Sequence, residues 1–205
     1  MVRRLVLATA NRGKARELGA LLGPGWEILL QSECGVAPVE ETGATFGENA
    51  LLKARHAAAA TGLPALADDS GLEVDALGGA PGVYSARYAG PGASDAQNID
   101  RLLAELAGVP PEQRTARFRC VLAFVRDAAD PRPLIAEGAW EGRITGAPRG
   151  INGFGYDPVF EDPALASTAA ELAPAAKNER SHRSRALRIL GDLLRAAERE
   201  EGRSR

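Results

Sequence analysis

Short apolar runs alternate with polar, glycine-rich breaks along the first third of the chain. Residues 4–8 and 26–30 are each dominated by large apolar side chains, which is typical of buried strands. Between them, residues 15–22 carry leucines at helical spacing, and a glycine–proline–glycine break follows. A third apolar run at 63–67 predicts another strand, which we expect to end at Asp68–Asp69–Ser70–Gly71.

Three capping boxes mark predicted helix starts. In each, a serine or threonine is followed three residues later by Glu or Gln, at 45/48, 94/97 and 168/171. The first predicts a helix reaching about residue 61, and the second a helix ending near residue 106. The apolar residues of 186–197 share one face of a final helix, and we expect residues 202–205 to fray.

Strands follow one another directly in the second half of the chain. Residues 118–125 and 134–140 predict a hairpin with a long turn, and 142–145 predicts a third strand. Alternating strands and helices followed by consecutive strands are typical of a mixed α/β sheet. No repeat and no linker interrupts the pattern, so we expect one domain over 1–205.

Composition excludes several classes of partner. The formal net charge of −2 argues against bulk electrostatic binding to nucleic acid. The arginines of the C-terminal segment are typical of the solvent-exposed face of a helix. No apolar run approaches the roughly 18 residues of a membrane span, and the N-terminus does not read as a signal peptide. Two cysteines do not make a disulfide framework. We expect a cytoplasmic protein that binds neither membrane nor nucleic acid.

Only three of the 25 basic residues are lysines, and each lies in a glycine- or acid-rich segment. Lys14 ends the break Thr9–Lys14, where a predicted strand turns into a predicted helix. Such a junction directs backbone N–H groups at an anion, with the lysine beside it. The segment lacks both the Walker A and the Rossmann pattern, so a phosphate site and an ordinary connection both remain open.

The adjacent carboxylates Asp68 and Asp69 follow a predicted strand, where α/β proteins commonly bind ligands. Neighbours on a strand point to opposite sides, so one can face a site while the other faces supporting groups. Carboxylate oxygens suit Mg²⁺, and Glu40 or Glu41 offers a second acid. Lys53, on a predicted helix, suits either neutralising these acids or reaching a phosphate. The alternative is an Asx-turn.

A glycine-rich loop, residues 153–158, carries two of the chain's few aromatic rings, which suit stacking on a base. The alternative is a tight turn with core aromatics. Downstream, Lys177 and the segment Ser181–His182–Arg183 place hydrogen-bond donors near predicted helix starts. Donors without neighbouring acids favour keto groups and phosphates.

Six segments, taken in order, resemble the inosine triphosphate pyrophosphatase family, the dITP/XTP diphosphatases. They are LATANRGKARELGALL, EETGATFGENALLKARHAA, LADDSGLEVDALGGAPGVYSARYAG, RFRCVLAF, GINGFGYDPVF and TAAELAPAAKNERSHRSRAL. The segments lie between residues 7 and 187, and the resemblance as a whole extends from about residue 5 to residue 194. The third and fifth are the most specific.

The resemblance implies an elongated mixed sheet flanked by helices, in two lobes with a nucleotide cleft between them, and a homodimer. It implies Mg²⁺-dependent hydrolysis of ITP, dITP and XTP to the monophosphate and pyrophosphate, which removes noncanonical purines from the nucleotide pool. Asp69 would be the proton acceptor and a metal ligand, with Glu41 or Glu40 contributing. The substrate would contact Thr9, Ala10, Asn11, Arg12, Gly13, Lys14 and Ser70, and the purine Phe154, Gly155, Tyr156, Asp157, Lys177, His182 and Arg183.

Hydrogen-bond chemistry offers a reason for such selectivity. A 6-oxopurine accepts hydrogen bonds at the position where adenine donates, so backbone N–H groups of 154–156 together with His182 and Arg183 would disfavour adenine. Two rivals remain. A Nudix-type or pyrimidine-specific phosphohydrolase is disfavoured because the Nudix pattern is absent. A nucleotide-binding regulator without activity is disfavoured by the intact acids and Lys14.

Overall fold

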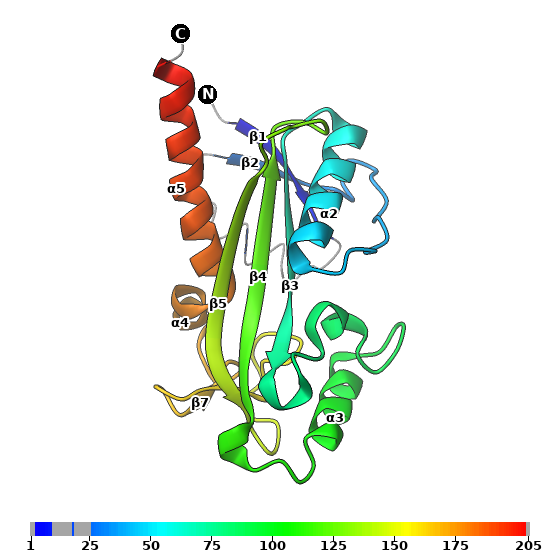
Figure 1. Ribbon diagram of the computed structural model, residues 1–205, viewed down its shortest axis with the longest axis vertical. Coiled ribbons are helices and arrows are strands. Elements are labelled where there is room, and N and C mark those ends of the chain that lie inside the picture. The colour runs from blue at the N-terminus through cyan, green and yellow to red at the C-terminus, as the bar shows by residue number, and fades with distance from the viewer. Residues whose placement is uncertain (1–2, 10–17, 19–25, 204–205) are drawn as a thin grey trace. The chain divides into compact units, whose positions relative to one another are not determined.

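The computed structural model describes residues 3–9, 18 and 26–203. Within these, seven strands form one sheet in the order β2-β1-β3-β4-β5-β6-β7 (Figure 1). The strands are β1 Arg3–Ala8, β2 Trp26–Leu30, β3 Ala65–Val74, β4 Thr115–Val125, β5 Leu134–Ile144, β6 Phe160–Asp162 and β7 Ser167–Thr168. The helices are α2 Phe46–Thr61, α3 Asp95–Glu105, α4 Pro174–Arg180 and α5 His182–Arg203, with short 3-10 turns η1 Asp75–Leu77, η2 Gly82–Arg87 and η3 Pro111–Gln113.

The sheet is mixed. β1 is parallel to both of its neighbours, with Leu5 opposite Ile28 of β2 and Val6 opposite Ala65 of β3. At the other edge β6 is antiparallel to β5 and to β7. The prediction of a mixed α/β sheet flanked by helices is therefore confirmed.

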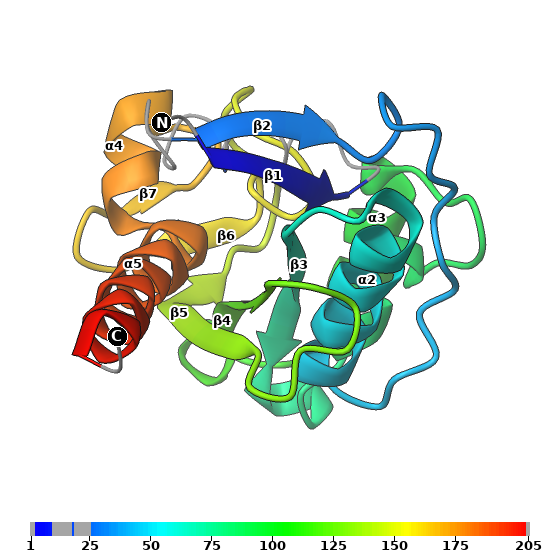
Figure 2. The same ribbon diagram turned by 90° about the horizontal axis from the view of Figure 1, so that it is seen from above.

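The chain forms two compact units. The first contains Met1–Asp69, Cys120–Gly138 and Arg183–Arg205, and the second contains Ser70–Arg119 and Ala139–His182. In the first unit, one face of the strands packs against α5 through Leu5, Leu66 and Leu122. Helices α2 and α5 lie on opposite sides of these strands (Figures 1 and 2).

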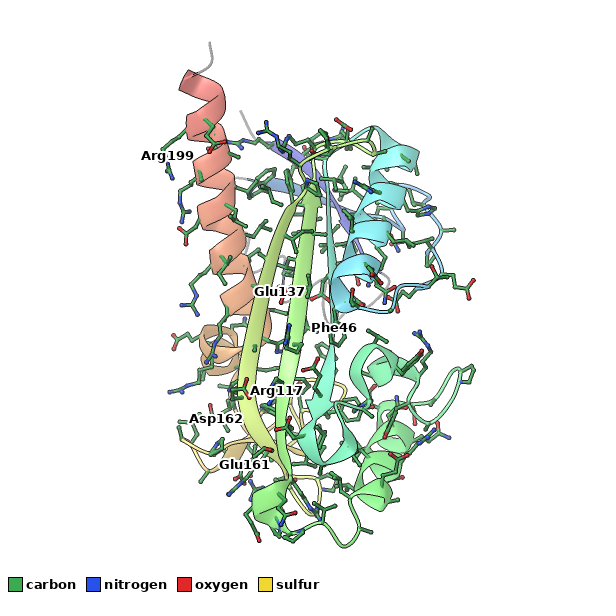
Figure 3. All side chains as sticks on the ribbon, in the orientation of Figure 1. Phe46, Arg117, Glu137, Glu161, Asp162 and Arg199 are labelled. Atoms are coloured by element: carbon green, nitrogen blue, oxygen red, sulfur yellow. The ribbon has the colours of Figure 1, made fainter. Side chains whose placement is uncertain are left out.

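The second unit has its own core, built around aromatic side chains. The ring of Phe160 lies with its centroid 4.3 Å from that of Phe118 and 5.2 Å from that of Trp140. Helix α3 adds Ile99 and Leu102 to this cluster. The neighbouring acids Glu161 and Asp162 are buried on β6 (Figure 3), and the Asp162 carboxylate accepts the indole N–H of Trp140 at 3.1 Å.

Several predicted elements are confirmed. The apolar runs at 4–8 and 26–30 are β1 and β2, and the first two capping boxes begin α2 and α3 with both reciprocal hydrogen bonds present. The final amphipathic helix is α5, which extends to Arg203. Of the helix predicted over 15–22, only Leu18 lies among the described residues, and it is helical.

Three boundaries were predicted wrongly. β3 does not end at Asp68 but continues to Val74, because the half-buried Lys53 and the buried Arg183 compensate the two aspartates within the strand. Residues 142–145 do not form a separate strand, since β5 runs through 134–144. The box at Thr168 begins no helix. The N–H of Thr168 donates to Glu171 as predicted, but Thr168 pairs with β6, and α4 begins only at Pro174.

Of the helices in the described part of the chain, none combines the length and the apolar character that crossing a membrane requires.

Candidate active site

The N-terminal turn of α2 holds the loop that carries the predicted acids. Thr45 caps the helix, and the Glu48 carboxylate accepts the Ala44 N–H of the preceding loop at 2.7 Å. One turn on, the buried Asn49 side chain accepts the Gly43 N–H at 2.7 Å. A Cβ on Gly43 would lie 2.7 Å from that same oxygen, so glycine is required for this close approach. The first turn of α2 therefore anchors Gly43 and Ala44, the loop residues that follow Glu41 closely in the chain.

Lys53 contacts two of the acids predicted from the sequence, Glu41 and Asp69. Its ammonium donates to Glu41 Oε1 at 2.8 Å, to Asp69 Oδ1 at 2.8 Å and to the backbone carbonyl of Asp68 at 2.7 Å. Because the two carboxylate oxygens lie at the same distance from one nitrogen, they cannot be further apart than twice that distance. Of the two roles open to Lys53, neutralising clustered acids is the one that this structure shows.

The electrostatics of this cluster favour a cation. Burial lowers the pKa of Lys53, but the charges of Asp69 and Glu41 and their hydrogen bonds raise it more, so the net shift is upward and the ammonium stays charged. With both acids ionised, two negative charges face one positive charge. Asp69 is buried and Glu41 half-buried, so water screens this imbalance weakly.

Asp68 faces the other side of the sheet. Its fully buried carboxylate accepts the Arg183 Nε–H at 3.2 Å and the Cys120 thiol at 3.1 Å, both on the α5 side. Asp69 meets Lys53 on the α2 side. The expectation that neighbouring acids on a strand serve opposite faces is therefore confirmed.

The other predicted residues of the first unit are placed less completely. Glu40 is exposed, whereas its neighbour Glu41 is half-buried and accepts the Lys53 ammonium. Thr9 is half-buried, and its N–H donates to the Leu7 carbonyl at 3.0 Å. The remaining residues of the predicted phosphate segment, Ala10, Asn11, Arg12, Gly13 and Lys14, lie outside the described residues.

In the second unit, Asp157 connects two residues that sequence reasoning assigned to the purine. Its buried carboxylate accepts the Lys177 ammonium at 2.6 Å and the Phe154 N–H at 2.9 Å. The ammonium lies 5.0 Å from the Phe154 ring centroid, within the range of a cation–π contact. A Cβ on Gly153 would fall 1.9 Å from the same carboxylate oxygen, so this turn also requires glycine.

The backbone donors expected from residues 154–156 are largely engaged. The Phe154 N–H goes to Asp157, and the Gly155 N–H donates to the Asp95 carboxylate at 2.7 Å. The Tyr156 hydroxyl donates to the Ser85 carbonyl at 2.9 Å, and burial raises the pKa of this phenol. Two of the backbone N–H groups expected to face the base, those of Phe154 and Gly155, are therefore engaged within the protein.

The segment Ser181–His182–Arg183 does open a helix, as predicted, and it is buried. His182 stacks on Phe118 with centroids 4.9 Å apart and planes 22° from parallel. The interpretation of Lys177 and Arg183 as donors without acids is wrong, because Asp157 and Asp68 pair with them.

The structure adds supporting residues that sequence reasoning did not single out. They are Gly43, Ser85, Asp95 and Cys120. The contacts of the last three cross more than 50 residues of chain, so no local pattern could have indicated them.

Comparison with known proteins identifies the family of this chain. A model of the Ham1 family matches residues 5–193. The chain belongs to the Ham1 family. A protein of Thioalkalivibrio sulfidiphilus named dITP/XTP pyrophosphatase is 62% identical over 192 residues, which span 93% of this chain and 98% of that protein. A protein of Pectobacterium atrosepticum with the same name is 59% identical, over 96% of this chain and all of its own length.

Solved structures of Ham1 proteins have the same fold. A HAM1 protein from Coxiella burnetii superposes with a TM-score of 0.87 at 50% identity, covering 95% of this chain and 99% of its own. The Ham1 protein of Staphylococcus aureus gives a TM-score of 0.84 at 41% identity, over 95% of this chain and all of its own. The resemblance found in the sequence is confirmed, and so is the mixed sheet flanked by helices that it implied.

Proposed function

We propose that this Ham1 protein is a nucleoside-triphosphate pyrophosphatase that hydrolyses dITP, XTP and ITP to the monophosphate and pyrophosphate. The observation that carries the proposal is the convergence of Glu41 and Asp69 on Lys53. The names of relatives at 57–62% identity support the substrate class. By this activity the protein would clear noncanonical purines from the nucleotide pool. The homodimer and the cytoplasmic location stay predictions.

The residues present fit a magnesium ion. Mg²⁺ is usually held by one or two carboxylates together with substrate phosphates and water, and no cluster of three or more potential ligands occurs among the described residues. Glu41 and Asp69 supply two carboxylates with an excess of negative charge, and we assign the metal to them. When bound, the ion would offset the charge of the phosphates and polarise the attacked phosphorus.

The hydrolytic step follows from the placement of Asp69. Water attacks the α-phosphorus, a new P–O bond forms, and the bond to the oxygen bridging the α and β phosphates breaks, so pyrophosphate leaves. Asp69 Oδ1 already accepts the Lys53 ammonium, and we assign the proton of the attacking water to its other oxygen. Lys53 holds this carboxylate in one orientation, as a positioned proton acceptor requires.

The base is assigned to side chains of the predicted purine set. Phe154 offers a ring face for stacking, and Lys177, His182 and Arg183 offer donors that suit the 6-oxo group. An adenine in the same place would bring its amino group against donors, and each buried unpaired donor costs about 1–3 kcal/mol.

Pyrophosphate release from dITP, XTP, ITP, dATP, dGTP and dUTP with Mg²⁺ tests the proposal. We expect fast turnover of the first three, loss of turnover in Asp69→Asn and Glu41→Gln, and full activity in Glu40→Gln as the matched control. In ¹⁸O-water the label should appear in the monophosphate. Release of orthophosphate, or label in pyrophosphate, would contradict cleavage at the α-phosphorus, and no turnover of any nucleotide would favour a binding protein.

A further inference from the structure

Asp68 lies beside the proposed proton acceptor but takes no part in its cluster through its side chain. It serves two cations with two different groups. Its backbone carbonyl accepts the Lys53 ammonium at 2.7 Å, and its carboxylate accepts the Arg183 Nε–H at 3.2 Å. A buried carboxylate needs such compensation, because a charge without a partner in the interior is very costly.

The start of α5 requires a carboxylate from elsewhere in the chain. The first turn of this helix contains His182, Arg183 and Arg185 and no acidic residue. The positive end of a helix dipole disfavours cations at these positions. Arg183 is nevertheless buried there, with 4% of its side chain exposed, and Asp68 from β3 pairs with it.

The pairing also restricts what Arg183 can do. A guanidinium is a planar fork, and the Asp68 carboxylate accepts its Nε–H, so this pairing constrains the plane of the fork. A carboxylate that is completely buried holds that fork in one orientation. Directional recognition of a 6-oxo group depends on such an orientation.

We propose that Asp68 is a positioning residue for base selectivity, acting through Arg183 rather than in the hydrolytic step. The inference rests on the proposed function, since it assigns Arg183 to the base of the same substrate. Asp68→Asn leaves the backbone bond to Lys53 possible, so this variant isolates the role of the side chain.

A double-mutant cycle tests this role. The variants are Asp68→Asn, Arg183→Met and the double variant, and kcat and KM are measured for dITP and dATP. We expect each single variant to raise KM for dITP and to lower the preference for dITP over dATP by about tenfold or more, the equivalent of one charge-assisted hydrogen bond. In the Arg183→Met background, Asp68→Asn should change that preference by less than about twofold.

If the wild type turns over dITP, the proposed function stands, and two outcomes would then overturn the inference alone. One is that the preference for dITP over dATP falls in the double variant by the product of the factors found in the two single variants. The other is that Asp68→Asn lowers kcat and leaves selectivity unchanged. Cys120→Ala removes a second side chain that contacts the same carboxylate oxygen, and as the matched control it should keep wild-type selectivity. Absence of turnover in the wild type would instead refute the proposed function.

A measurement on the wild type covers the case in which Asp68→Asn does not fold. The ¹⁵N–¹H signal of Arg183 Nε, assigned by its loss in Arg183→Lys, should be well resolved and slow to exchange with solvent, and it should shift when dIMP is added. A signal that exchanges with solvent as fast as those of exposed arginines, or that does not shift when dIMP is added, would overturn the inference.

Discussion

Replacing Lys53 by methionine removes the charge that holds Glu41 and Asp69 together. At 2.8 Å and an effective dielectric constant of about 20, each ion pair supplies about 6 kcal/mol of attraction, from which the desolvation of the three groups is subtracted. Breaking a buried pair by removing one partner typically costs about 3–5 kcal/mol. Because Glu41 remains 28% exposed, we expect the lower end, about 3 kcal/mol.

This loss is measurable by urea unfolding and by thermal unfolding. For a chain of this size it corresponds to a fall in Tm of about 6–12 °C. Since the pKa of Lys53 is raised in the folded protein, its contribution is present below the ordinary lysine pKa of about 10.4 and is lost only as pH rises through the folded-state value. The difference between wild type and variant should therefore be constant from pH 7 to pH 9.

Magnesium provides a second readout of the same reasoning. Without the ammonium, the two carboxylates repel each other, and a divalent cation can take over its neutralising role. Added Mg²⁺ should thus raise the Tm of Lys53→Met more than that of the wild type. Arg195→Met, which breaks an exposed pair with Asp192, is the control and should change stability by less than about 0.5 kcal/mol. An unfolding midpoint of Lys53→Met equal to that of the wild type would refute the reasoning.

Two further predictions concern Gly43 and Glu161. Gly43→Ala should lower kcat by roughly tenfold, because the new Cβ would displace the loop that carries Glu41. Gly47→Ala is the control, since a Cβ there would meet no atom nearer than 4.0 Å. It should keep activity and stabilise the helix by up to about 1 kcal/mol. In the second unit, burial raises the pKa of Glu161, but hydrogen bonds from Arg143 and Arg149 lower it more. The stability that Glu161 contributes is thus present above about pH 4.3 and lost as pH falls through the folded-state pKa. The urea midpoints of wild type and Glu161→Gln should differ at pH 7 and converge in acid, and a constant difference down to pH 3 would contradict this assignment.

Local patterns were a reliable guide where the determining contacts are themselves local. The capping boxes at Thr45 and Ser94 are closed within four residues, so their spacing alone predicted both helix starts. The alternation of side chains along β3 has the same local character. It was enough to predict that Asp68 and Asp69 would face opposite sides of the sheet.

Partners distant in the chain could not be predicted in this way. Asp68 meets Arg183 across 115 residues, and Asp157 meets Lys177 across 20, so donors that stand without acids in the sequence are paired in the fold. The same lack of information about distant partners explains why the end of β3 was predicted wrongly. Two consecutive acids are typical of a strand end only when no buried cation compensates them.

The uninterrupted course of β3 through its two aspartates limits how the gene for this protein can change length. Deleting or inserting one residue between Ala65 and Asp68 would turn the first acid towards Lys53 and the second towards Arg183, so each cation would meet a carboxylate from the wrong position. The residue types would be retained and the chemistry lost. We therefore expect substitutions in this stretch to be tolerated better than the insertion or deletion of a single residue. In a library of variants with different strand lengths, only those that gain or lose an even number of residues here should be active.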